Sequence, residues 1–167
     1  MGWSEEIFKA LQKGGISQVG FVPDAGLSDV ISLAQADPQM TATVLTTEQE
    51  GIGLACGAWL GGQKAVLLMQ SSGVGNCINM LSLVANCRFP FLTIVTMRGE
   101  WGEFNPWQVP MSRAVRPALE MMGLHVYRPA RPEDLAPAVD AALEMTFCAD
   151  QAAAILIGQD LIGRKVW

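Results

Sequence analysis

The residue with the clearest potential for chemistry in this sequence is Glu48. It follows a short β-type run at 41–45 and opens a helix-like segment, 48–60, that is rich in small residues. A carboxylate at such a strand-to-helix junction can be buried against a ligand, because small neighbours leave room for close approach. An acidic residue in the first turn of a helix also stabilises the helix dipole, and this structural role fits Glu50 best. The residues alone leave Glu48 open between the two roles.

Other polar groups that could bind a ligand lie in three further segments, each directly after a strand-like run. These segments are Pro23-Asp24-Ala25-Gly26, Gln70–Asn76 and the connection 97–110. Gln70–Asn76 is rich in glycine and serine, so it predicts either a loop that approaches a ligand closely or a tight turn without one. It is not a P-loop, since no Gly-Lys-Ser/Thr follows, and Gly73-Val74-Gly75 lacks the third glycine of a dinucleotide-binding loop.

The connection 97–110 is long and combines charged, polar and aromatic residues. It holds two tryptophans and the polar residues Arg98, Glu100, Glu103, Asn105 and Gln108. Long ordered loops in compact domains usually carry a function. Exposed aromatic residues beside polar groups suit a subunit interface, a substrate lid or both, and a plain surface loop is the third alternative.

Alternating strands and helices must position these segments. Strand-like runs occupy 18–22, 41–45, 65–69, 91–96, 124–127 and 153–157. Helix-like runs occupy 4–13, 27–36, 48–60, 75–86, 112–122 and 132–145. The runs 65–69 and 91–95 are continuously apolar, which is typical of strands buried on both faces of a parallel sheet. The pattern predicts an α/β fold with an open, mostly parallel sheet and helices on both faces.

The order of elements also predicts where a ligand would bind and where the first helix begins. Open parallel sheets bind ligands at the carboxyl ends of their strands, so we expect the four polar segments to lie together at that edge. Ser4, followed by two glutamates, predicts an N-cap for the first helix, and Gly14-Gly15 predicts its end.

Composition limits the classes of function. Half of the 167 residues are apolar and 16% are charged, which is enough for one domain with a well-buried core. The net charge of −5 without a basic run excludes typical nucleic-acid binding, and no apolar stretch reaches the length of a membrane span. The N-terminus lacks the features of a signal peptide, so we expect a cytoplasmic protein.

The metal-binding and thiol side chains are sparse. A single histidine excludes a His-rich zinc site. The four cysteines have no CxxC spacing, and we expect them to be reduced thiols that pack as small apolar residues.

Four features fall in the order and spacing of one known family. They are Gly20-Phe21-Val22-Pro23, Glu48 nine residues before Gly57, Ser72-Gly73-Val74-Gly75 after an apolar strand, and the strand 91–96. The pattern resembles the pyrimidine-binding (PYR) domain of thiamine diphosphate enzymes. The stretches TTEQEGIGLACGAWLGG, LLMQSSGVGNCIN and MRGEWGEFNPWQVPM are similar to sulfopyruvate decarboxylase alpha subunits and to the matching part of phosphonopyruvate decarboxylases. The resemblance extends over nearly the whole chain, so 1–167 is expected to be a single PYR domain.

The resemblance implies roles for particular residues. Glu48 matches the glutamate that hydrogen-bonds the aminopyrimidine nitrogen of the cofactor, which favours the tautomer that removes the thiazolium C2 proton. Val74, in a turn between Gly73 and Gly75, matches the residue that packs on the pyrimidine, with Asn76 beside it. Pro23 matches a loop at the cofactor pocket. The residues expected on the substrate side are Asp24, Ala25, Gln70, Arg98 and Gln108.

The activity implied by the resemblance is decarboxylation of a 2-oxo acid such as sulfopyruvate, which gives sulfoacetaldehyde and CO₂. An anionic sulfonate needs cationic partners, and the arginines near the polar segments are Arg98 and Arg113. Thr47 stands where many relatives have histidine, so proton shuttling would fall to a partner chain or to water. The alternatives are a subunit of a related thiamine-dependent C–C lyase or ligase, phosphonopyruvate decarboxylase, or a non-catalytic scaffold subunit.

The family binds the diphosphate and Mg²⁺ through a Gly-Asp-Gly motif and a later Asn, in a second, diphosphate-binding (PP) domain. This sequence contains no Gly-Asp-Gly. The resemblance therefore implies a PP-domain beta subunit that carries Gly-Asp-Gly…Asn and shares thiamine diphosphate and Mg²⁺ with this chain, which itself supplies no metal ligand. Homodimerisation within a larger hetero-oligomer is also expected.

Overall fold

The computed structural model describes residues 2–163, and its central feature is a parallel β-sheet. Within this range, six strands pair in the order β2-β1-β3-β4-β6-β5. All five pairings are parallel. The strands are β1 (Ile16–Phe21), β2 (Thr41–Val44), β3 (Lys64–Gln70), β4 (Phe91–Thr96), β5 (His125–Tyr127) and β6 (Ala152–Ile157). The open α/β sheet that the apolar strands predict is thereby confirmed, and each predicted strand overlaps an observed one.

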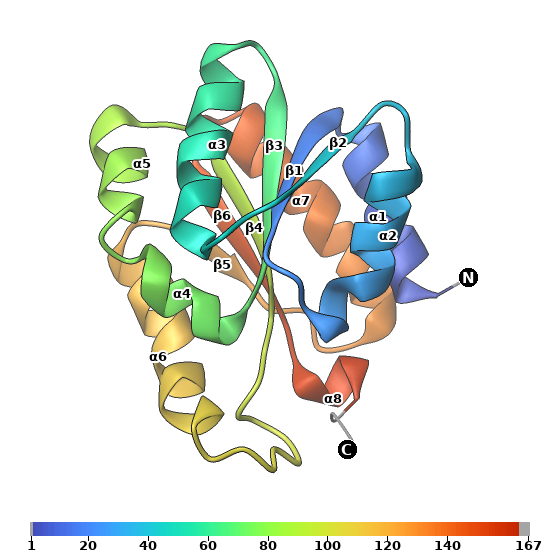
Figure 1. Ribbon diagram of the computed structural model, residues 1–167, viewed down its shortest axis with the longest axis vertical. Coiled ribbons are helices and arrows are strands. Elements are labelled where there is room, and N and C mark those ends of the chain that lie inside the picture. Colours follow the sequence, from blue (N-terminus) through green and yellow to red (C-terminus); the bar gives the residue numbers. More distant parts are fainter. Residues whose placement is uncertain (1, 164–167) are drawn as a thin grey trace.

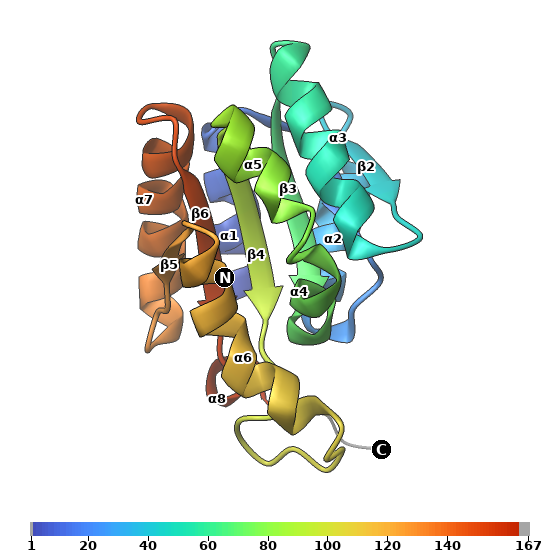
Figure 2. The same ribbon diagram turned by 90° about the vertical axis from the view of Figure 1, so that its left-hand side faces the viewer.

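Helices cover both faces of this sheet (Figures 1 and 2). One face carries α1 (Trp3–Lys13), α2 (Ser28–Ala36) and α7 (Leu135–Phe147). The other face carries α3 (Glu48–Leu60), α4 (Ser71–Cys77), α5 (Leu81–Cys87) and α6 (Gln108–Met121). Single turns are found at Ala25–Leu27, Pro132–Asp134 and α8 (Gln159–Ile162). No helix in the described part of the chain is long and apolar enough to cross a membrane.

The direction of each crossover decides which face its helix covers. Parallel β–helix–β connections are right-handed, so connections that run in opposite directions along the sheet place their helices on opposite faces. The connections β1 to β2 and β5 to β6 run one way and carry α2 and α7. The other three run the opposite way and carry α3 to α6. The two directions diverge between β1 and β3, and open α/β sheets bind ligands at such a point.

The central strands are buried on both sides, which explains their uninterrupted apolar sequence. In β3, Val66 and Leu68 belong to the core under α1, α2 and α7, whereas Leu67 and Met69 belong to the core under α3 to α6. Burial of each such side chain contributes about 1.5–3 kcal/mol. The buried hydroxyl of Thr93 in β4 donates to the carbonyl oxygen of Leu67 at 2.9 Å, so this polar atom is satisfied within the sheet.

Three predicted helix boundaries are wrong. Gly2 is the N-cap of α1, and Ser4 lies inside the helix with its side chain buried. The helix predicted at 75–86 is two helices, because α4 begins directly after β3 and ends before α5 starts at Leu81. The Gly73-Val74-Gly75 segment is therefore helical and not a turn. Helix α6 begins at Gln108, four residues before the predicted start.

The cysteines follow the prediction in part. All four are free thiols, and Cys56 and Cys77 are buried as small apolar residues. Cys87 and Cys148 are exposed, so the predicted packing is wrong for these two. They lie at or next to the ends of α5 and α7, where the sequence alone does not decide burial.

The contact between α3 and β3 should tolerate no added methyl group at Gly51. A Cβ there would lie 2.3 Å from Leu67 Cδ1 and 2.9 Å from Leu45 Cδ1. Because Leu67 is fully buried, we expect Gly51→Ala to lower the free energy of unfolding by about 1–3 kcal/mol. Gly57→Ala is the matched control on the same helix, since its Cβ would meet nothing within 4 Å. It should stabilise by about 0.5–1 kcal/mol. Urea denaturation measures both, and equal effects would contradict this packing.

Candidate functional site

The polar segments meet at the carboxyl edge of the sheet, as predicted. In Figure 1 this is the lower end of β3 and β4, where α4, α8 and the connection 97–107 lie. The segment after β1 begins at Val22, α4 follows β3 without a loop, and the connection 97–107 follows β4. A fifth segment, Gly158-Gln159 after β6, joins them. Glu48 follows β2 at the start of α3.

Glu48 is a buried carboxylate with a defined polar partner. Its residue is 8% exposed, although it is the first residue of α3. Asn76 Nδ2 donates to Glu48 Oε2 at 2.8 Å. Glu50 also lies in the first turn of α3, and its Oε2 accepts from Thr46 N at 2.9 Å. In this turn Glu50 is thus exposed and binds the preceding backbone, whereas Glu48 is buried.

Gly73 is the residue that lets α4 approach this carboxylate. A Cβ at Gly73 would lie 2.4 Å from both Cγ and Oε1 of Glu48. Any side chain at this position would therefore push the carboxylate away. Asn76, one turn further along α4, then holds the same carboxylate. Both residues belong to α4, which begins directly after β3.

The remaining residues of the predicted Gly-Val-Gly element are placed differently. Val74 is fully buried in the core under α3 to α6, so it has no free surface within the chain itself. Gly75 is exposed, and a Cβ there would lie 3.1 Å from Met111 Sδ of α6. The predicted contacts of Gly73, Val74 and Gly75 with a cofactor stay predictions.

The Glu48 charge also affects a neighbouring thiol. Burial, together with this nearby negative charge, raises the pKa of Cys77 from 9.0 to about 12. Cys77 is fully buried and its Sγ lies 3.9 Å from Met69 Sδ. It therefore stays protonated at neutral pH and acts as an apolar packing residue rather than a nucleophile.

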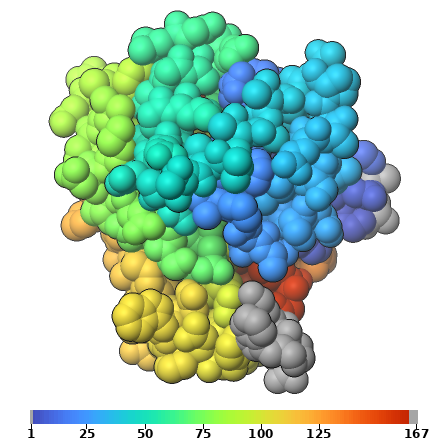
Figure 3. Space-filling model, in the orientation of Figure 1, coloured from blue at the N-terminus to red at the C-terminus, as the bar shows by residue number. Residues whose placement is uncertain are grey.

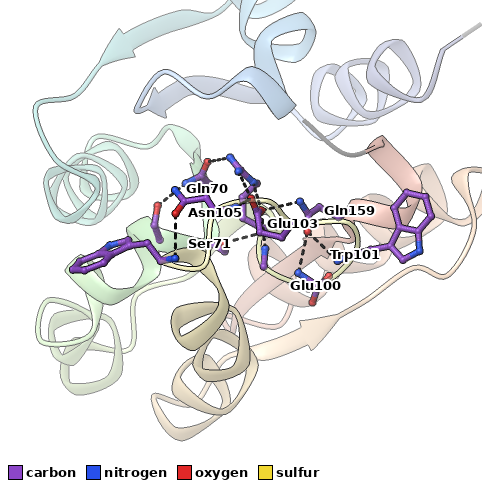
Figure 4. A network of polar contacts seen from close by, with 11 residues as sticks. Gln70, Ser71, Glu100, Trp101, Glu103, Asn105 and Gln159 are labelled. Atoms are coloured by element: carbon purple, nitrogen blue, oxygen red, sulfur yellow. Dashed lines mark hydrogen bonds and ion pairs between the residues drawn. The ribbon is translucent and has the colours of Figure 1, made fainter. Parts of the chain in front are cut away.

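Arg98 and Glu103 form a bidentate ion pair that organises the connection 97–107 (Figure 4). Arg98 Nε and Nη2 donate to the two Glu103 oxygens, both at 2.7 Å. The side chains are 12% and 3% exposed. The backbone N–H groups of Gly99 and Asn105 also donate to Glu103. These hydrogen bonds, chiefly those from Arg98, lower the pKa of Glu103 from 4.5 to about 2.

Gln159 is a further site residue that sequence reasoning missed. Its side chain is buried, and Nε2 donates to Glu103 Oε2 at 3.0 Å. Its Oε1 accepts from the backbone N–H groups of Glu100 and Trp101. Gln159 thus ties the connection 97–107 to the end of β6 (Figure 4). The signal in the sequence was a glycine followed by polar residues directly after the apolar run 153–157.

The end of β3 links the two parts of the site. Ser71 Oγ accepts from Arg98 N at 3.1 Å, and Gln70 Nε2 donates to Ser72 Oγ at 2.7 Å. Gln70 Oε1 lies 3.5 Å from Arg98 Nη1. Since Gly73 touches Glu48, the run 70–73 connects the arginine network directly to the buried carboxylate.

A cavity of about 150 Å³ opens beside the arginine network, at the ends of β1, β4 and β6. Thr96 Oγ1 donates to Asp24 Oδ2 across the ends of two strands. Of the residues predicted on the substrate side, Asp24, Ala25 and Arg98 line this cavity. Its full lining is Asp24, Ala25, Gly26, Thr96, Arg98, Gln159, Ile162 and Gly163.

Pro23, Gln70 and Gln108, which were also predicted as site residues, do not line this cavity. Pro23 is exposed and lines a separate surface hollow with Ala25. Gln70 adjoins Arg98, as described above. Gln108 begins α6, and its Oε1 is buried without a hydrogen-bond partner among the described residues. Within residues 2–163, no group of three or more His, Cys, Asp or Glu side chains could hold a metal ion.

Comparison with known proteins identifies the family. No protein-family model matches the chain. The sulfopyruvate decarboxylase subunit alpha of Methanococcus maripaludis is 35% identical over 158 residues, which covers 94% of this chain and 95% of that protein. The chain belongs to the sulfopyruvate decarboxylase alpha-subunit family. The resemblance read from the motifs is thereby confirmed.

Two longer proteins contain a part that is similar to this chain. The sulfopyruvate decarboxylase of Methanosarcina acetivorans is 31% identical over 72% of this chain, which corresponds to 31% of that protein. The structure of 2-oxoglutarate:ferredoxin oxidoreductase from Magnetococcus marinus superposes with a TM-score of 0.78 over 100% of this chain and 33% of that one. At 15% identity, this second likeness shows the shared fold.

The depressed pKa of Glu103 predicts a pH-dependent contribution to stability. Because the folded-state pKa of about 2 lies below the ordinary 4.5, the ionised pair stabilises fully above about pH 4.5. This stabilisation is lost as the pH falls towards 2. Glu103→Gln should lower the free energy of unfolding by about 1.5–3 kcal/mol at pH 7.

The difference between wild type and Glu103→Gln should shrink between about pH 4.5 and 2. Urea denaturation across this range measures it. Glu133→Gln is the control, since Glu133 belongs to an exposed pair with Arg131 and should change stability little at any pH. A difference for Glu103→Gln that is constant with pH would contradict the assignment.

Proposed function

We propose that this chain is the PYR-domain alpha subunit of a heteromeric thiamine diphosphate-dependent sulfopyruvate decarboxylase. The enzyme would convert 3-sulfopyruvate and a proton into sulfoacetaldehyde and CO₂. The observation that carries the proposal is the buried Glu48 carboxylate, held by Asn76 against the glycine face of α4. Its support from comparison is the 35% identity to a sulfopyruvate decarboxylase alpha subunit over nearly the whole chain.

The residues of this chain fit one end of the cofactor. A buried carboxylate with a fixed orientation suits a ring nitrogen that shares a proton, and Glu48 with Asn76 provides it. The other end is a diphosphate with a divalent cation, which needs oxygen ligands arranged around the metal. The described residues contain no such group, and the sequence contains no Gly-Asp-Gly. Glu48, Asn76 and Gly73 would thus contact the pyrimidine end, while the diphosphate and Mg²⁺ would be held by the partner.

The chemistry of Glu48 follows from its surroundings. Thiamine diphosphate, when bound, supplies the nucleophilic carbon and the electron sink that decarboxylation of a 2-oxo acid requires. Glu48 would hold or release a proton at its carboxylate, opposite the ring nitrogen. Asn76 donates to one carboxylate oxygen and so fixes the direction of the other. Burial of the residue excludes competing water, which makes the proton transfer specific to the bound ring.

A partner subunit is needed to complete this site. The maripaludis relative is named an alpha subunit, and the chain matches about a third of the longer Methanosarcina acetivorans protein. Both observations fit an enzyme in which this domain is one of several. The partner would carry the PP domain with Gly-Asp-Gly…Asn and would cover the exposed side of α4 near Asn76.

The cavity of this chain offers little positive charge to an anionic substrate. Arg98 is neutralised by Glu103, and Asp24 adds a negative charge to the cavity that both line. An anionic sulfonate would meet little net positive charge there. The sulfonate is therefore expected to be bound mainly by the partner, while Asp24, Ala25, Gln70 and Arg98 shape the adjoining wall. Phosphonopyruvate is the second candidate, because a phosphonopyruvate decarboxylase of Streptomyces viridochromogenes is 39% identical over 53% of this chain.

Removing the acid function of Glu48 should abolish most of the activity. Glu48→Gln keeps the shape of the side chain, and loss of one acid–base group typically lowers kcat by about 10²–10⁴-fold. Glu50→Gln is the matched control in the same helical turn, with its carboxylate exposed and bound to Thr46 N. It should leave kcat within about threefold of wild type. CO₂ release by the complex with the partner subunit is the assay, and unchanged turnover in Glu48→Gln would refute the role.

Activity should also require the second subunit. With thiamine diphosphate and Mg²⁺ present, this chain alone should release no CO₂ from sulfopyruvate, phosphonopyruvate or pyruvate. The same chain purified with its PP-domain subunit should be active, with sulfopyruvate as the preferred substrate. Turnover by the isolated chain would refute the division of the site, and preference for another 2-oxo acid would correct the substrate.

A further inference from the structure

The connection 97–107 is held together by hydrogen bonds within itself. Glu103 accepts from three residues of the same segment, namely Arg98, Gly99 and Asn105. Such bonds fix the internal shape of the segment, but they do not fix where it lies on the sheet. Its position therefore depends on side chains of other elements that bind it.

Gln159, which follows β6, binds the middle of this connection from outside (Figure 4). Its Nε2 donates to Glu103 Oε2 at 3.0 Å, and its Oε1 accepts from the N–H groups of Glu100 and Trp101 at 2.9 and 3.1 Å. Gln159 is 1% exposed, so water does not compete for these bonds. One amide group thus fixes both the backbone of the connection and its central carboxylate.

Two other attachments of the connection differ from this one. Ser71 Oγ accepts from Arg98 N at 3.1 Å and so holds the start of the connection. Arg128, which follows β5, binds both carboxylate oxygens of Glu100 at 2.7 and 2.6 Å. The side chains of that pair are 37% and 20% exposed, and pairs that meet solvent contribute less than buried ones. Of the attachments at the middle of the connection, Gln159 is the buried one.

The position of the connection matters because the connection supplies one wall of the cavity at the ends of β1, β4 and β6. Arg98 lines this cavity opposite Asp24. In Figure 3 the connection forms the lower part of the molecular surface, below α4. The groups of a binding site must be held within about 0.5 Å of their working positions by the residues that bind them. Arg98 is bound by Glu103, and Glu103 is bound in turn by Gln159.

We propose that Gln159 is a positioning residue, which acts through Glu103 to set the place of Arg98 in the wall of this cavity. The inference rests on the proposed function in one respect, because it takes the cavity to adjoin the bound 2-oxo acid. The side chain must be an amide, since it donates to a carboxylate and accepts from two N–H groups. An ionised carboxylate cannot donate, and an apolar side chain can neither donate nor accept.

Hydrogen exchange tests the positioning without an assay of activity. In the isolated chain, Gln159→Leu should raise the exchange rates of the Glu100 and Trp101 amides at least about tenfold, because both lose their acceptor. The Arg98 amide should follow, since its own bond depends on where the connection lies. Arg128→Gln is the control and should leave the Arg98 amide within about threefold of wild type. Unchanged exchange at Arg98 in Gln159→Leu would overturn the proposal.

Kinetics of the complex with the partner subunit test the consequence for the substrate. Gln159→Leu should raise KM for sulfopyruvate at least about tenfold and leave kcat within about threefold of wild type, because Glu48 and Asn76 keep their contact. A merely structural role would reduce the amount of active enzyme, so the apparent kcat would fall at constant KM. That result, or an equal rise of KM in Arg128→Gln, would overturn the proposal.

Gln159→Glu keeps the size of the side chain and tests the donor. The introduced carboxyl would face Glu103 Oε2, and two carboxylates at that distance share a proton, so its pKa should be raised. While protonated, it can donate to Glu103 as the amide does. The other charged groups nearby are the same in both proteins, namely Asp24, Arg98, Glu100, Arg128 and Asp160.

The ratio of KM in Gln159→Glu to KM in wild type should therefore rise at least about tenfold from pH 5 to pH 9, as the introduced carboxyl loses its proton. A ratio that is constant over this range would overturn the proposal. If the wild-type complex releases no CO₂ from sulfopyruvate, the proposed function fails. Hydrogen exchange at Arg98 then still decides whether Gln159 positions it.

Discussion

The close contact between α4 and the Glu48 carboxylate is the constraint on which the site depends. A carboxylate in the first turn of a helix is normally solvated, because its charge is costly to remove from water. Here it is buried because Gly73 offers no side chain and Asn76 donates a hydrogen bond. In this geometry α4 begins at Ser71, directly after the last residue of β3 and without a loop. The connections β2 to β3 and β3 to β4 run in the same direction along the sheet, so α3 and α4 cover the same face. Glu48 of α3 and Gly73 of α4 can therefore come into contact.

The arginine network beside the site has a different purpose. A buried pair such as Arg98–Glu103 gains little net stability over apolar packing, but it fixes a single arrangement of the groups around it. Here Glu103 accepts from two backbone N–H groups as well as from Arg98 and Gln159. The hydrogen bonds to Glu103, rather than those of a helix or strand, therefore order the connection 97–107. Because Glu103 compensates the positive charge of Arg98, Arg98 cannot at the same time serve as a free cation for an anionic substrate.

The sequence predicted the parts of this molecule that depend on local pattern. Strands such as Phe91–Thr96 are recognisable because burial on both faces leaves them uniformly apolar. Glu48 is recognisable because its strand-to-helix junction is rich in small residues. The helical state of Gly73 and Val74 was missed, since glycine disfavours an isolated helix and the compensating contact of Gly73 with Glu48 is 25 residues away in sequence. Gln159 was missed for the same reason, because its partners in the connection 97–107 lie on another strand's loop.

Two open surfaces of the chain follow from one feature, which is that α4 and α6 pack side by side. Met111 of α6 rests against Gly75 of α4, so the exposed side of α4 near Asn76 and the apolar outer face of α6 adjoin without overlapping. The first surface includes exposed Asn76, whose side chain donates to the buried Glu48. The second is apolar, with Trp107 and Met121 largely exposed.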